Sequence, residues 1–176
     1  MPEASSRERF EQEVLPHLDA AYNLARWLTR NEQDAQDVTQ EAFLRAFRFF
    51  DGYQGGSIRA WLLTIVRNTC YTWFRQNRPS DPGEEFDEEI HSPESPGATD
   101  PEVQLLARAD QETLRHALGE LPEVFREVII LRELEGMSYK EIADMASISI
   151  GTVMSRLARA RTRLRDVLCA PQGKES

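Results

Sequence analysis

Cysteine, histidine and long apolar runs are scarce in this chain of 176 residues. Its two cysteines, Cys70 and Cys169, lie far apart, and its three histidines lack the spacing of metal ligands. A disulfide framework or a structural metal site is therefore not expected, and no cofactor is indicated. No apolar run is long enough to cross a bilayer and no signal peptide is recognisable, so the sequence predicts a cytoplasmic protein without direct membrane insertion.

Basic residues are missing from residues 79–101, which carry eight acidic side chains. Residues 1–78 have ten acidic and ten basic side chains, and residues 102–176 have twelve and eleven. The net charge of -9 therefore comes almost entirely from the middle segment. That segment is rich in Pro, Gly, Ser and carboxylates and has little to bury. It is predicted to be a flexible acidic linker between two small domains, residues 1–78 and 102–170.

Strand patterns are also missing, and helical periodicity runs through nearly the whole chain. We therefore predict an all-α fold with two small helical domains. The first helix is expected over residues 10–29, with Pro16 near its first turn or at a bend. Its inward side is expected to hold Val14, Leu15, Leu18, Tyr22, Ala25 and Leu28. Further helices are expected over residues 32–50, 57–77 and 102–118, and from Pro122 to a left-handed C-cap at Gly136.

Two helices joined by a tight turn are predicted in residues 138–168. Ser138 and Glu141 form a capping-box pattern for the first helix, and Ser149 can cap the second after a turn at 146–149. On the second helix one apolar stripe must be buried: Ile150, Val153, Leu157, Ala160, Leu164 and Leu168. Another face carries Thr152, Ser155, Arg156, Arg159 and Arg163. This is the layout of a helix-turn-helix whose second helix enters the DNA major groove; the alternative is an arginine-rich solvated helix.

Two N-terminal helices have polar faces of different character. On residues 32–50 the polar stripe holds Asp34, Asp37, Glu41, Arg45 and Arg48, and the buried side holds Val38, Ala42, Phe43, Ala46, Phe47 and Phe50. This stripe is either a solvated face or a partner-binding face. On residues 57–77 the stripe Thr64, Arg67, Asn68, Tyr71, Arg75 and Arg78 lies opposite Trp61, Leu62, Ile65, Val66 and Trp73. This combination of arginines, an amide and an aromatic ring is suited to binding single-stranded nucleic acid. The alternative is a core helix whose basic side is simply exposed to solvent.

The two halves together resemble a known family. The run DAQDVTQEAFLRAFRFFDGYQGGSIRAWLLTIVRNTCYTWFRQNR is similar to region 2 of the sigma-70 family in its extracytoplasmic-function (ECF) form. The run LGELPEVFREVIILRELEGMSYKEIADMASISIGTVMSRLARARTRLR is similar to region 4. The resemblance implies a bacterial RNA polymerase sigma factor without catalytic activity of its own. Such a protein binds core polymerase, recognises the minus-thirty-five and minus-ten promoter elements, promotes strand opening and is usually restrained by an anti-sigma factor.

The resemblance also implies a role for each polar face. It assigns core polymerase binding to Asp37, Gln40, Glu41, Phe43 and Arg45. It assigns capture of the single-stranded minus-ten element to Tyr53, Gln54, Gly55, Arg67, Asn68, Tyr71, Arg75 and Arg78, with Asn68 prominent. It assigns reading of the minus-thirty-five duplex to Ser149, Thr152, Val153, Ser155, Arg156, Arg159 and Arg163. Met154 departs from the family pattern, in which a basic residue is frequent, so a DNA contact at that position is in question.

Two other classes of function are open on the residues alone. A helix-turn-helix repressor or response-regulator output domain would use residues 120–168 and leave the N-terminal polar faces without a task. An enzyme could use the carboxylates Glu84, Glu85, Asp87, Glu88 and Glu89, but a linker cannot hold them rigidly. In a sigma factor, this acidic linker is expected to thread core polymerase near the basic template-strand channel and RNA exit.

Overall fold

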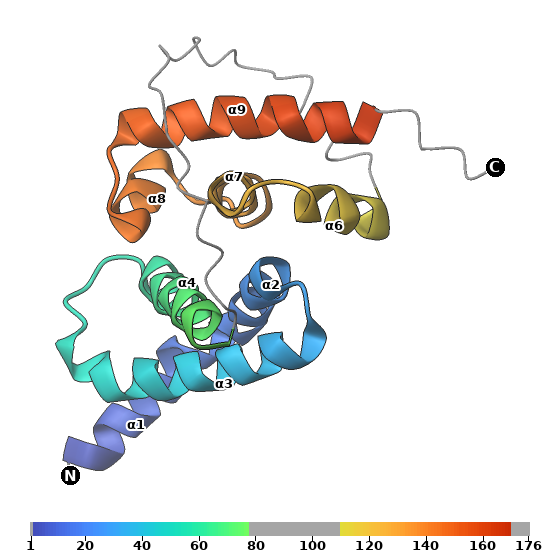
Figure 1. The fold of residues 1–176 in the computed structure, drawn as a ribbon. Helices are drawn as coiled ribbons and strands as arrows, with labels where there is room; N and C mark the ends of the chain where they lie inside the picture. The colour runs from blue at the N-terminus through green and yellow to red at the C-terminus, as the bar shows by residue number, and fades with distance from the viewer. Residues whose placement is uncertain (1, 78–109, 170–176) are drawn as a thin grey trace. The chain divides into compact units, whose positions relative to one another are not determined.

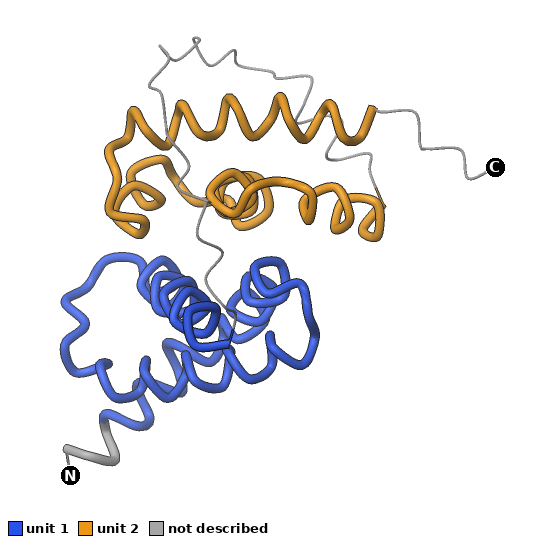
Figure 2. Tube along the Cα trace, viewed as in Figure 1, with its two compact units in different colours: residues 1–86 blue, residues 87–176 orange. Residues whose placement is uncertain are grey.

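A computed structural model describes residues 2–77 and 110–169, and every regular element in these ranges is helical (Figure 1). The chain divides into two compact units, residues 1–86 and 87–176 (Figure 2). The predicted all-α class with two helical domains is therefore confirmed. The acidic linker and the exact domain limits fall outside the described residues.

Unit 1 is a small helical bundle. Its elements are α1 (Pro2–Glu13), the 3₁₀ turn η1 (Leu15–His17), α2 (Leu18–Thr29), α3 (Glu32–Phe49), the 3₁₀ turn η2 (Phe50–Gly52) and α4 (Ile58–Asn77). Helices α2, α3 and α4 pack against one another in all three pairings (Figure 1). The core between them contains Leu24, Ala25, Leu28, Val38, Ala42, Leu62, Leu63, Val66 and Cys70.

The expectation of one helix over residues 10–29 is wrong. Helix α1 ends at Glu13, and Pro16 lies within η1, which separates α1 from α2. Proline lacks a backbone N–H and clashes with the preceding turn, so the helix cannot continue through it. The break turns Leu15 and Leu18 outward, each 44% exposed, although the periodicity predicted both to be buried.

Unit 2 is built around its last helix. Its described elements are α6 (Gln111–Gly119), α7 (Glu123–Ile129), the π-helical turn η3 (Ile130–Leu134), α8 (Tyr139–Ala146) and α9 (Ile150–Cys169). Helix α9 packs on α6, α7 and α8. The expected C-cap is confirmed, because Gly136 follows η3 with a φ of 68°. Of the helix expected over residues 102–118, the structure describes the part from Gln111 onward.

The cap residues set the start of each functional helix. The Ser138 hydroxyl accepts from the Glu141 backbone N–H at 3.0 Å, and the Glu141 carboxylate accepts from the Ser138 N–H at 2.9 Å. The Ser149 hydroxyl accepts from the Thr152 N–H at 3.0 Å, as the sequence predicted. Ser57 accepts in the same way from the Ala60 N–H at 3.1 Å. These bonds satisfy otherwise unpaired donors in the first turns of α8, α9 and α4.

Candidate nucleic-acid and partner-binding surfaces

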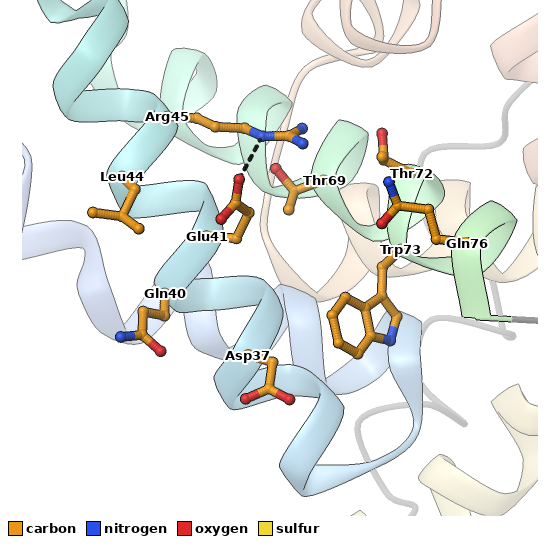
Figure 3. A pocket seen from close by; sticks show the side chains of 9 residues that line it. All are labelled: Asp37, Gln40, Glu41, Leu44, Arg45, Thr69, Thr72, Trp73 and Gln76. Carbon is orange, nitrogen blue, oxygen red and sulfur yellow. Dashed lines mark hydrogen bonds and ion pairs between the residues drawn. The ribbon is translucent and has the colours of Figure 1, made fainter.

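A groove of about 600 Å³ lies between α3 and α4 (Figure 3). Its α3 wall is formed by Asp37, Gln40, Glu41, Leu44 and Arg45, and its α4 wall by Thr69, Thr72, Trp73 and Gln76. The Arg45 guanidinium donates from Nε to Glu41 Oε1 at 3.2 Å, and the Gln33 amide donates to Asp37 at 3.2 Å. The groove therefore combines carboxylates and amides with the indole of Trp73.

Four of the five residues predicted to bind core polymerase lie together in this groove. Phe43 does not. It is half-buried on the side of α3 that faces α1, with its ring centroid 6.4 Å from that of Phe10. The α4 wall was not identified from the sequence. Leu44, which is 58% exposed and lines the groove, was also not identified.

The loop between η2 and α4 rests on aromatic rings. Tyr53 stacks parallel to Phe50 with centroids 6.4 Å apart and lies 5.4 Å from Trp61. The Tyr53 hydroxyl donates to the Gly56 carbonyl oxygen. Gln54 and Gly55 are exposed on the loop. The residues predicted to bind the minus-ten element thus differ in accessibility, because the Tyr53 ring faces the protein.

The outer face of α4 carries the other residues predicted for the minus-ten element. Asn68 and Arg75 are exposed, and Arg67 and Tyr71 are half-buried. The Arg67 guanidinium donates to the Asn68 side-chain oxygen at 3.1 Å and lies 4.4 Å from the centroid of the Tyr71 ring. Arg78 lies outside the described residues. Trp73, expected on the core side, lines the groove instead.

The predicted recognition face of α9 is partly accessible. Ser149 and Arg163 are exposed, and Thr152, Ser155, Arg156 and Arg159 are half-buried. Val153 was predicted both in the buried stripe and, by resemblance, at the DNA. Its side chain is fully buried with Leu157, Ala160 and Leu164, which agrees with the first prediction and not with the second. Ile150 was predicted to be buried at the start of the stripe, but its side chain is 46% exposed. The buried stripe is therefore shorter than the sequence predicted.

Two α9 arginines contact their own unit. The Arg163 guanidinium lies 5.1 Å from the centroid of the buried Phe125 ring on α7. The Arg161 Nη2 lies 2.6 Å from Glu133 Oε1, and both side chains are about 85% buried. Burial would lower the pKa of Arg161, but the hydrogen bond and charge of Glu133 outweigh it and raise this pKa above its usual value. Arg161 therefore ties α9 to η3 as a permanent cation.

Other kinds of site are not seen in the ranges that the structure describes. No group of three or more His, Cys, Asp or Glu side chains there could hold a metal ion. No described helix is long and apolar enough to cross a membrane. Both cysteines are free thiols, Cys70 buried in unit 1 and Cys169 exposed at the end of α9.

Known proteins match both units. Residues 14–79 match the family described as Sigma-70 region 2, and residues 111–164 match Sigma-70, region 4. The chain is 35% identical over 162 residues to the ECF RNA polymerase sigma factor SigE of Mycolicibacterium smegmatis, covering 90% of this chain and 61% of that protein's length. It is 37% identical over 134 residues to the ECF RNA polymerase sigma-E factor of Escherichia coli, covering 73% of this chain and 70% of that one.

A solved structure is similar as well. The sigma factor RpoE of Bartonella quintana, crystallised in complex with the anti-sigma factor NepR, has a TM-score of 0.72 and 31% identity, covering 94% of this chain and 99% of that one. The fold, the helix-turn-helix and the matched regions define a transcription factor of the sigma class. The chain belongs to the ECF RNA polymerase sigma factors of the sigma-70 family, which serve transcription initiation and are not enzymes.

Proposed function

We propose that this protein binds bacterial core RNA polymerase, directs it to promoters with a minus-thirty-five and a minus-ten element, and promotes strand opening. Unit 2 reads the minus-thirty-five duplex through α9, and unit 1 captures the minus-ten single strand through the loop of residues 53–56 and the outer face of α4. The protein works where the polymerase works, in the cytoplasm.

The observation that carries this proposal is the groove between α3 and α4. Asp37, Gln40 and Glu41 lie in one hollow with Trp73, which provides hydrogen-bonding groups around an apolar anchor. A repressor that only binds duplex DNA has no use for this surface in a separate unit. A partner protein explains why the polar side of α3 is hollowed rather than evenly solvated.

The DNA assignments follow from chemistry on the two outer faces. Small hydroxyls and arginines along α9 can reach base edges and phosphates in a major groove. The exposed amide of Asn68 and the exposed guanidinium of Arg75 suit an unstacked base and its backbone.

An anti-sigma factor is the second proposed partner. The Bartonella quintana relative was solved in complex with one, and it spans nearly the same length as this chain. We propose that the anti-sigma factor of this protein covers the groove between α3 and α4, so that it competes with core polymerase for Asp37, Glu41 and Trp73.

The test is transcription reconstituted from purified parts. Core polymerase, the full chain and a library of duplex templates with random minus-thirty-five and minus-ten segments are combined, and the transcribed templates are sequenced. The expected result is enrichment of one paired motif at a fixed spacing, dependent on the added chain. Binding of duplex DNA by the chain alone, with no association with core polymerase and no enriched pair, would support the repressor alternative.

A further inference from the structure

We propose that Tyr53 is a positioning residue that holds the loop of residues 53–56 in shape, so that Gln54 rather than Tyr53 meets the minus-ten strand. The inference rests on the proposed function and deepens it. Similarity to the family had placed Tyr53 among the residues that touch DNA. Its contacts in this structure are with the protein instead.

Both ends of the Tyr53 side chain are engaged. The ring packs against Phe50, the first residue of η2, and Trp61, in the first turn of α4, with centroids 6.4 and 5.4 Å away, and these two rings lie 6.2 Å from each other. The hydroxyl donates to the carbonyl oxygen of Gly56, three residues along the chain. The side chain thus links the first residue of the loop to Gly56, its last residue.

The backbone of this loop is intrinsically flexible, so a side-chain restraint helps to keep it in one conformation. Gly55 and Gly56 have φ values of 94° and 89°, a region that residues with a Cβ rarely adopt. Two successive glycines also give the unfolded and the open loop many alternative conformations, so an added restraint is required to keep one of them. The hydrogen bond to Gly56 supplies that restraint, and Gln54 is left exposed at the tip.

The platform under the loop extends into α1. Phe10 is 7% exposed and packs edge-on against Phe50 at 5.5 Å and Phe47 at 5.2 Å. The Arg9 guanidinium lies 5.5 Å from the Phe50 centroid, and the Ser6 hydroxyl donates to Asp51 at 3.2 Å. Residues 2–13 precede the segment that matches Sigma-70 region 2. Phe50, the ring that stacks on Tyr53, is therefore also contacted by α1, which lies outside that segment.

The experiment separates the loop's shape from its use. Tyr53→Phe keeps the ring and removes the hydroxyl. Its matched control is Tyr22→Phe, which removes the hydroxyl of a half-buried tyrosine on α2. In the full chain without DNA, the NMR order parameters of the Gly55 and Gly56 amides are expected to fall below about 0.6 in Tyr53→Phe and to stay at the wild-type value in the control. Unchanged order parameters in Tyr53→Phe would overturn the proposal.

A double-mutant cycle then tests whether Tyr53 affects DNA binding through Gln54. In holoenzyme, Tyr53→Phe is expected to weaken binding of a minus-ten single strand roughly three- to tenfold. The same change made in a Gln54→Ala background is expected to have little further effect, because the residue that the loop presents is gone. An equal loss in both backgrounds would mean that the Tyr53 hydroxyl touches the strand, and would overturn the proposal. If wild-type holoenzyme binds no such strand, the proposed function fails, while the order parameters still decide whether Tyr53 holds the loop.

Discussion

Helices α4 and α9 are both 20 residues long and both carry a stripe of arginines, yet their arginines contact different partners. On α9, Arg161 pairs with Glu133 and Arg163 covers the Phe125 ring, so arginines link the helix to other elements of unit 2. On α4, Arg67 contacts Asn68 and Tyr71 of its own helix. Arginines of similar spacing thus contact another element of the unit on α9, and an amide and a ring of the same helix on α4.

The two helices also differ in the number of distinct surfaces to which they contribute side chains. Helix α4 is buried along Leu62, Val66 and Cys70, forms one wall of the groove with Trp73, and keeps an outer face with Asn68. Helix α9 has one buried stripe and one outer face. A substitution on α4 can thus affect partner binding or DNA binding according to its position around the helix. The predictions below test this division, beginning with the largest effect.

Reversing the charge of the groove should abolish polymerase binding. Asp37→Arg combined with Glu41→Arg turns two negative side chains of the groove into positive ones, and like charges brought together in an interface cost several kcal/mol. We expect the double variant to lose co-purification with core polymerase while its isolated contact with minus-thirty-five duplex is unchanged. The matched control is Glu11→Arg with Glu32→Arg, two exposed carboxylates of unit 1 outside the groove. Wild-type association of the groove variant would mean that this face of α3 is merely solvated.

Removing arginines from the outer face of α9 should weaken duplex binding without unfolding unit 2. Arg156→Ala and Arg159→Ala are each expected to cost about 1 to 3 kcal/mol in binding to a minus-thirty-five duplex, with relaxed preference at one base pair for a base-reading arginine. Arg48→Ala, an exposed arginine on α3, is the control. Fluorescence anisotropy on a panel of single-base-pair variants measures both effects. Unchanged affinity in the double variant would remove α9 as the recognition helix.

Breaking the Arg161 pair should affect stability instead. Arg161→Met leaves the mostly buried Glu133 without its cation, and we expect unit 2 to lose about 1 to 3 kcal/mol of unfolding free energy. Because the pKa of Arg161 is raised above its value in the unfolded chain, the stabilisation that comes from this guanidinium is complete at neutral pH and is lost as the pH rises into strong alkali. All three tryptophans lie in unit 1, so urea unfolding followed by tryptophan fluorescence should be unchanged while the transition followed by circular dichroism shifts. A shift in neither signal would show the pair to be dispensable.

Much of the fold was predictable because helix caps and buried stripes are local patterns. The Ser138 capping box, the Ser149 cap and the left-handed Gly136 are set by residues within a few positions of each other, and all three were predicted correctly. The stripe through Leu157 and Leu164 followed from helical periodicity in the same way. Pro16 was predicted to lie near the first turn or at a bend, but the full break into two helices was not predicted, because the apolar spacing continues across it.

What the sequence did not reveal depends on contacts between elements. Trp73 was expected in the core, but the meeting of α3 and α4 leaves its side chain in the groove. Tyr53 was assigned to DNA, but its neighbours Phe50 and Trp61 belong to different helices that approach only in the folded unit. Nothing in the local sequence distinguishes Arg161 from the other arginines of α9. Its structural role comes from the hydrogen bond to Glu133, which is distant in sequence. These contacts depend on which helix faces meet in the folded unit, and helical periodicity does not encode that.

The smallest expected effect distinguishes two residues on the same face of α4. The Asn68 side chain can donate to and accept from a base edge, whereas the exposed Arg75 chiefly follows phosphates. On a panel of minus-ten single strands with each base varied, Asn68→Ala should change the preference at one position. Arg75→Ala should weaken all strands alike and lower the salt slope by about 0.7 for the lost phosphate contact. Asn68 also accepts a hydrogen bond from Arg67, so it has a structural alternative. An unaltered base profile in Asn68→Ala together with a lowered melting temperature would assign it to that structural role and leave base capture to the loop that presents Gln54.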